Sequence, residues 1–152
     1  MLRIVEITPA FAVTGALKAD DLAEVASGGF RSLISNLPDG ELPGFPAGDQ
    51  EGALAGRCGL AFRHIPLRKA EMFSARNVLA MREALGALPP PILAHCASGQ
   101  RSALAWATAA VAAQDVERVL AQLRAAGFDF APLRVELESL AGLGDGVQGD
   151  GG

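Results

Sequence analysis

The sequence predicts one α/β domain with a mostly parallel central sheet and helices on both of its faces. Short apolar runs alternate with helix-like segments along residues 1–141, which is typical of strands that alternate with helices. The run 91–96 (PILAHC) is almost wholly apolar, as expected of a strand buried on both faces of a parallel sheet. Residues 142–152 are rich in Gly and predict a disordered tail rather than a second domain.

The N-terminal part of the chain predicts three strands and one helix. Residues 2–7 and 10–13 predict two short edge strands on either side of a Thr-Pro pair. Residues 18–29 predict a helix that starts at two Asp residues and stops at two Gly residues. Residues 30–37 mix β-branched and aromatic side chains and predict a strand, which ends at the turn sequence PDGE.

The middle of the chain opens with residues 38–48, which contain three Pro and three Gly and therefore predict no regular element. Residues 49–58 predict a short helix with Asp49 as its cap, and residues 60–67 predict a strand. A longer helix is predicted to begin at the N-cap Ser74 and to end before three successive Pro residues.

Three helices are predicted after the strand at 91–96. The first, residues 102–113, is apolar all round and rich in Ala, so we expect it in the middle of the domain. The second runs from the cap Asp115 to Gly127, and the third covers residues 131–142. Parallel sheets of this kind bind ligands where strands end and helices begin. The junction after the strand at 91–96 is therefore the expected site.

Composition argues against several classes of function. The net charge is −4 and the Lys and Arg residues are scattered, so we expect no nucleic acid partner. Glu6 and Pro9 interrupt the apolar N-terminal residues, and no later run is long enough to cross a bilayer, so we expect a cytoplasmic protein without a membrane partner. The two His and two Cys residues have no zinc-like spacing, and we expect neither a metal nor a cofactor. The oligomeric state is left open.

The sequence HCASGQRS, residues 95–102, lies at the expected site. Gly99 allows the chain to turn there with its amides facing inward. These amides, the start of the next helix and the guanidinium of Arg101 would all favour the thiolate form of Cys96. Between Cys96 and Arg101 lie four residues, Ala97, Ser98, Gly99 and Gln100.

We predict Cys96 as the nucleophile and Arg101 as the group that holds an oxyanion with two hydrogen bonds. His95 is expected either to tune the cysteine or to hold neighbouring backbone. Ser102 is expected to hydrogen-bond the sulfur. The residues predicted to contact the bound anion are Ala97, Ser98, Gly99, Gln100 and Ser102.

HCASGQRS resembles the phosphate-binding loops of cysteine phosphatases, in which His-Cys opens the loop and Arg-Ser closes it. Those phosphatases carry five residues between Cys and Arg, one more than this chain. From ITPAFAVTGAL through GLAFRHIPL to HCASGQRSALAW, residues 3–126 are similar to the bacterial beta-lactamase hydrolase-like, phosphatase-like domains, also described as phosphatase-like sulfurtransferases. The resemblance implies a fold like that of dual-specificity and tyrosine phosphatases. Family members often have Arg where this chain has Ala97.

Sulfur transfer is the predicted reaction. The tighter loop resembles that of rhodanese sulfurtransferases, which hold a cysteine persulfide. The segment HIPLRKAEMFS, where such phosphatases usually carry an Asp as general acid, contains only Glu71. We therefore expect Cys96 to take sulfur from a small-molecule donor such as thiosulfate, a polysulfide or glutathione persulfide, and to pass it to an acceptor thiol or cyanide.

Two other functions are kept as alternatives. A cysteine phosphatase would hydrolyse phosphoesters through a phosphocysteine on Cys96, with Glu71, Asp39 and Glu41 as candidates for the general acid. A non-catalytic module would bind an anion or a phosphopeptide, although such a module would not need a thiol. The second cysteine, Cys58, is predicted to pack among small residues, with a redox role as the alternative.

Overall fold

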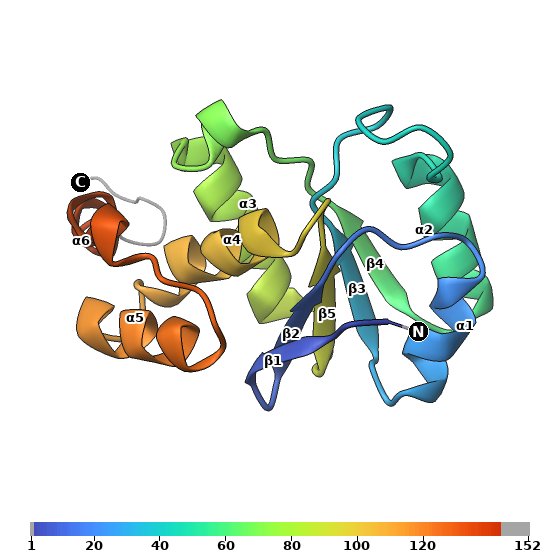
Figure 1. The fold of residues 1–152 in the computed structure, drawn as a ribbon, viewed down its shortest axis with the longest axis horizontal. Helices are drawn as coiled ribbons and strands as arrows, with labels where there is room; N and C mark the ends of the chain where they lie inside the picture. Colours follow the sequence, from blue (N-terminus) through green and yellow to red (C-terminus); the bar gives the residue numbers. More distant parts are fainter. Residues whose placement is uncertain (1, 144–152) are drawn as a thin grey trace.

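The central sheet has five strands in the order β1-β2-β5-β3-β4 (Figure 1). It is seen in a computed structural model, which describes residues 2–143. β1 is antiparallel to β2, and all other neighbouring strands are parallel, so the mostly parallel sheet predicted from the sequence is confirmed. The strands are β1 (Val5–Thr8), β2 (Phe11–Thr14), β3 (Ser32–Ser35), β4 (Ala61–His64) and β5 (Ile92–His95).

The prediction that residues 10–13 form an edge strand is wrong. β2 pairs with β1 on one side and with β5 on the other, where Thr14 lies opposite His95. Val13 packs in the core on one face of the sheet and Ala12 in the core on the other. A strand that is apolar on both faces belongs inside a sheet, and only β1 lies at this edge.

Helices cover both faces of the sheet, α1 and α2 on one face and the later helices on the other (Figure 1). Leu33 and Leu93 point to the first face, whereas Ile34 and Ala94 point to the second, because successive strand residues face opposite sides. The helices are α1 (Asp21–Ser27), α2 (Gly48–Arg57), α3 (Ala75–Ala87), α4 (Gln100–Ala110), α5 (Val116–Ala125) and α6 (Arg134–Ala141), with 3₁₀ turns η1 (Lys69–Glu71) and η2 (Ala131–Leu133).

The starts of two helices test the predicted caps. Ser74 caps α3 as predicted, and its hydroxyl accepts a hydrogen bond from the Asn77 N–H. The predicted cap Asp49 is wrong, because α2 already begins at Gly48. The carboxylate of Asp39 accepts a hydrogen bond from the Gly48 N–H at 2.8 Å and so satisfies a free amide at this helix start.

The C-terminal end of the domain consists of α5, η2 and α6. The helix predicted over residues 131–142 is confirmed, with its first three residues forming the 3₁₀ turn. The tail was predicted over residues 142–152, and its residues from 144 onward lie outside the described part of the chain. Within the described part of the chain, no helix combines the length and the apolar character needed to span a membrane.

Candidate active site

β5 carries the predicted nucleophile to the carboxyl edge of the sheet. His95 ends the strand, and Cys96 follows it directly and is fully buried. Gly99 turns the chain with a φ of +94°, and its N–H donates a hydrogen bond to the Cys96 Sγ at 3.1 Å. The start of the loop therefore curls back over the sulfur.

The loop ends earlier than the sequence predicts. α4 begins at Gln100 rather than near Ser102, because Gly99 in its left-handed conformation already provides the N-cap position. Arg101 consequently lies in the first turn of the helix, next to the positive end of the helix dipole. The anion-binding features expected of the loop and of the helix are thus parts of one turn.

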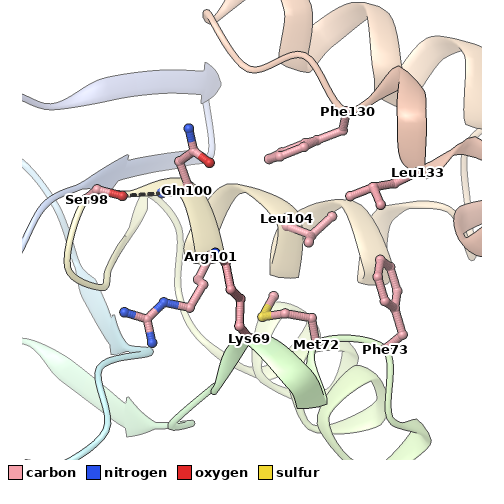
Figure 2. A pocket seen from close by; sticks show the side chains of 9 residues that line it. All are labelled: Lys69, Met72, Phe73, Ser98, Gln100, Arg101, Leu104, Phe130 and Leu133. Carbon is pink, nitrogen blue, oxygen red and sulfur yellow. Dashed lines mark hydrogen bonds between the residues drawn. The ribbon is translucent and has the colours of Figure 1, made fainter. Parts of the chain in front are cut away.

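The segment between β2 and α1 braces the loop from outside. The Ala16 N–H donates a hydrogen bond to the Ala97 carbonyl at 3.4 Å. A Cβ atom at position 15 would lie 3.2 Å from the same carbonyl oxygen, so Gly15 permits this close approach. Ser98, in the loop, accepts the Gln100 N–H at 3.5 Å (Figure 2).

The side chain of Arg101 is held by two partners far away in the sequence. Its Nη1 donates to the Glu41 Oε1 at 2.9 Å and to the Leu67 carbonyl at 2.8 Å, and its Nη2 donates to the second carboxylate oxygen of Glu41. The Arg101 side chain is 18% exposed and that of Glu41 33% exposed. This partly shielded, two-pronged ion pair fixes the plane of the guanidinium.

Both partners of this ion pair have shifted pKa values. The hydrogen bond from Arg101 is the main cause that lowers the pKa of Glu41, and the charge of Arg68 adds to it. The same hydrogen bond raises the pKa of Arg101, and the neighbouring Cys96 raises it further. Because the folded-state pKa of Glu41 is depressed, the stabilisation is fully present above the ordinary value of 4.5 and is lost as pH falls through the lowered pKa.

Glu41 and Leu67 leave two N–H donors of Arg101 unused. A guanidinium has five N–H groups in one plane. Glu41 and Leu67 use three of them, two on Nη1 and one on Nη2. The Nε–H and the second Nη2–H remain, and they lie along one edge of the plane, where they can grip two oxygens of a tetrahedral anion. The charge of Cys96 and a hydrogen bond with its side chain both contribute to the raised pKa of Arg101.

The sequence suggested that Ser102 donates a hydrogen bond to the sulfur, but in the structure it has another acceptor. Its hydroxyl proton goes to the Asn36 Oδ1 at 2.8 Å, and both side chains are buried. Asn36 also donates its backbone N–H to the His95 carbonyl at 2.7 Å and its Nδ2 to the Ile65 carbonyl at 2.9 Å. Sequence reasoning missed Asn36, although an Asn directly after a buried strand and before a turn is a signal that could have drawn attention to it.

His95 pairs with a second residue that sequence reasoning missed. Its Nε2 lies 2.5 Å from the Glu51 Oε2, and both side chains are buried, that of Glu51 being 2% exposed. Within residues 2–143, the other ring nitrogen of His95 has no hydrogen-bond partner. Glu51 lies in the first turn of α2, so this contact ties that helix to the residue next to Cys96. This contact is with a carboxylate side chain rather than with the neighbouring backbone, so it is neither of the two roles predicted for His95.

The substitution Glu51→Ala is expected to lower the free energy of unfolding by about 3 kcal/mol, because it leaves a buried polar group without its partner. Urea unfolding followed by circular dichroism measures this change. Glu83→Ala is the matched control. It removes a carboxylate from an exposed ion pair with Arg63 and should cost less than about 1 kcal/mol. Equal losses in the free energy of unfolding would show that the buried pair stabilises the fold no more than the exposed pair does.

The three candidate acids have different places. Asp39 caps α2, and its Oδ1 lies 3.8 Å from the His64 Nε2. Glu71 lines a separate depression together with His64 and Arg68. Of the three, only Glu41 binds a predicted site residue, because it accepts hydrogen bonds from Arg101 at the start of α4. None of the three is placed as a free general acid over Cys96.

The two cysteines are both free thiols. Cys58 follows α2 directly, is half-buried and packs against the core on the α1 and α2 face, in line with the expected packing role. Among residues 2–143, no group of three or more His, Cys, Asp or Glu side chains is placed to hold a metal ion.

A pocket of about 460 Å³, which we call the side pocket, adjoins the loop and the start of α4 (Figure 2). Its polar end is formed by Ser98, Gln100 and Arg101, and Lys69 lies at its border. Its other end is apolar. The apolar side chains come from α4 and from the segments around η1 and η2, namely Leu104, Met72, Phe73, Phe130 and Leu133.

Comparison with known proteins identifies the family. The profile of the beta-lactamase hydrolase-like protein, phosphatase-like domain matches residues 2–114, which include the whole cysteine loop. The chain belongs to this family. The beta-lactamase hydrolase-like protein of Xylella fastidiosa strain 9a5c is 34% identical over 142 residues, or 92% of this chain. The phosphatase-like domain described here spans about a third of the length of that relative, since the match covers 33% of it.

Solved structures place the phosphatase-like domain among the tyrosine and dual-specificity phosphatase folds. A candidate phosphatase from Neisseria meningitidis superimposes with a TM-score of 0.75 at 24% identity, covering 90% of this chain and 97% of its own. TpbA of P. aeruginosa superimposes with a TM-score of 0.61 at 17% identity, covering 92% of this chain and 89% of its own. The fold implied by the resemblance in the sequence is therefore confirmed.

Proposed function

We propose that this phosphatase-like domain is a cysteine-dependent phosphatase that hydrolyses phosphomonoesters. The observation that carries the proposal is the placement of Arg101 in the first helical turn after Cys96, where Glu41 and Leu67 orient its guanidinium and leave two parallel N–H donors unused. The family is described as phosphatase-like, and TpbA of P. aeruginosa was solved in complex with pTyr in a cysteine-to-serine form. These comparisons support hydrolysis better than the sulfur transfer predicted from the sequence.

In the proposed reaction the Cys96 thiolate attacks phosphorus. An S–P bond forms as the P–O bond to the leaving group breaks, and the leaving oxygen takes a proton from water. Arg101 and the inward N–H groups of the loop hold the non-bridging oxygens, where charge accumulates in the transition state. Water then attacks the phosphocysteine, the S–P bond breaks, and phosphate leaves as the thiolate forms again.

The positions of the carboxylates limit which substrates this site can cleave. Asp39 is engaged at the start of α2, Glu41 is engaged by Arg101, and Glu71 faces a different depression. An alkoxide leaving group needs a proton from a positioned acid, whereas a phenolate needs little help. The arrangement therefore favours phosphate esters with an aryl leaving group.

Sulfur transfer is a second candidate, favoured by the four-residue spacing between Cys96 and Arg101 and by the engagement of Asp39, Glu41 and Glu71 elsewhere. In this reaction the Cys96 thiolate attacks the outer sulfur of thiosulfate, an S–S bond forms, and sulfite leaves with the electron pair of the broken bond. Cyanide would then remove the outer sulfur as thiocyanate and restore the thiolate. No acid takes part in either step.

Incubation with para-nitrophenyl phosphate tests the proposal. We expect release of phosphate, and acid quenching should trap one phosphoryl group on Cys96, located by intact mass and peptide mapping. An alkyl phosphate should react at least about a hundredfold more slowly, because its alkoxide lacks an acid.

A parallel incubation with thiosulfate separates the alternatives. A cyanide-reversible persulfide on Cys96 without release of phosphate would overturn the phosphatase proposal in favour of sulfur transfer. Binding of inorganic phosphate with neither product would also overturn it, in favour of a non-catalytic anion-binding module.

A further inference from the structure

The side pocket has separate polar and apolar ends, which points to a ligand with the same division. We propose that it binds the apolar group of the substrate, and that the substrate is a small aryl phosphate monoester. Its phosphate would lie at the end formed by Ser98, Gln100 and Arg101, with its ring against the apolar end (Figure 2). The phosphate part of this assignment rests on the proposed function, whereas the apolar part rests on the pocket.

The charges around the side pocket favour an anionic head group. No lining residue is acidic, and two are cationic, Arg101 and Lys69. Glu41 and Leu67 leave one edge of the Arg101 guanidinium unused. Within residues 2–143, Lys69 forms no ion pair with a carboxylate, so its charge is available at the border of the pocket. A neutral ligand would leave the charge of Lys69 without a partner.

The apolar end offers surface that a ring would cover. Three of its apolar side chains face the pocket and are only partly buried, namely Phe73, Phe130 and Leu133 (Figure 2). Covering such surface removes apolar area from water and stabilises a complex in proportion to that area. A volume of about 460 Å³ falls within the range of small-molecule sites, which are mostly apolar with a few polar groups that fix orientation.

Part of the apolar wall comes from outside the segment that matches the family profile. Phe130 and Leu133 lie beyond residues 2–114, the part that matches the family profile. They are carried by η2 and the residue before it, and α6 follows directly. The aryl ring also agrees with the positions of Asp39, Glu41 and Glu71, because an aryl leaving group does not need a positioned acid.

Two phosphonates that cannot be hydrolysed test the inference without relying on turnover. Calorimetric titration should show that benzylphosphonate binds at least about tenfold more tightly than methylphosphonate. Phe130→Ala and Leu133→Ala should each reduce this ratio at least about threefold and leave the Kd of methylphosphonate unchanged. Val135→Ala, which changes a 73% exposed apolar residue on α6 outside the pocket, should leave the ratio as it is.

The outcomes separate this inference from the proposed function. Equal affinities for the two phosphonates, or a ratio that survives both Phe130→Ala and Leu133→Ala, would overturn the aryl site while phosphate release still supports the phosphatase. A ratio that behaves as expected, without any release of phosphate from an aryl ester, would support the pocket and overturn the phosphatase. Failure of both phosphonates to bind, together with no phosphate release, would overturn both.

Discussion

Cys96→Ser should lower kcat for any reaction of this domain by at least about a thousandfold. A serine hydroxyl at this position is a far weaker nucleophile than a thiolate, and the loss of a covalent nucleophile is among the largest single effects in enzymes. Phosphate release from para-nitrophenyl phosphate measures the effect on hydrolysis. Intact mass after incubation with thiosulfate measures the effect on persulfide formation.

Cys58→Ser is the matched control for this substitution. Cys58 is a free thiol at the end of α2, with no contact to the loop among the hydrogen bonds of the described residues, so we expect less than about a twofold change. Comparable losses in the two cysteine variants would contradict the assignment and point to a cycle in which the thiols form a disulfide.

Arg101→Lys should lower kcat/KM for an aryl phosphate by about a hundredfold or more. The Lys ammonium is a single point of charge, so it cannot bind Glu41 with two hydrogen bonds and also present two parallel donors to an anion. Loss of one preorganised donor to the transition state typically costs two to three orders of magnitude. Steady-state kinetics of phosphate release measure the change, and the loss should fall mainly on kcat.

Two controls make the Arg101→Lys result specific. Arg63→Lys changes an exposed arginine in an ion pair with Glu83 and should leave kinetics unaltered. Glu41→Gln keeps Arg101 but weakens its orientation, so we expect a smaller loss than in Arg101→Lys. The orienting role would be contradicted if Glu41→Gln lowered kcat/KM as much as Arg101→Lys and also removed one limb of the pH profile of kcat/KM. That result would make Glu41 the general acid.

The local chemistry of the site could be predicted from the sequence because it lies within one short stretch. An apolar strand, a Cys, a left-handed Gly and an Arg in the first helical turn are neighbours in the chain, and each restricts the next. The fold class followed from the alternation of strands and helices in the same way. These are features that local propensity and spacing encode directly.

The partners of the loop could not be predicted because they come from distant segments. Glu41 lies in a stretch rich in Pro and Gly, where a lone acidic residue is usually solvated, and Glu51 lies in the first turn of a helix, where an acidic residue is common. The neighbours of a strand are likewise set by the whole sheet. For that reason β2 was expected at an edge and instead lies beside β5.

The contacts of Arg101 make anion binding depend on segments that are distant in the sequence. Its guanidinium is oriented by a carboxylate 60 positions earlier in the chain and by a backbone carbonyl 34 positions earlier. Those two segments follow β3 and β4, so the anion grip exists only when these strands have joined the strand that carries the cysteine. A partly folded chain would hold the thiol but not an aligned arginine. Competence for anion binding thus depends on the long-range topology of the sheet rather than on the local helix alone.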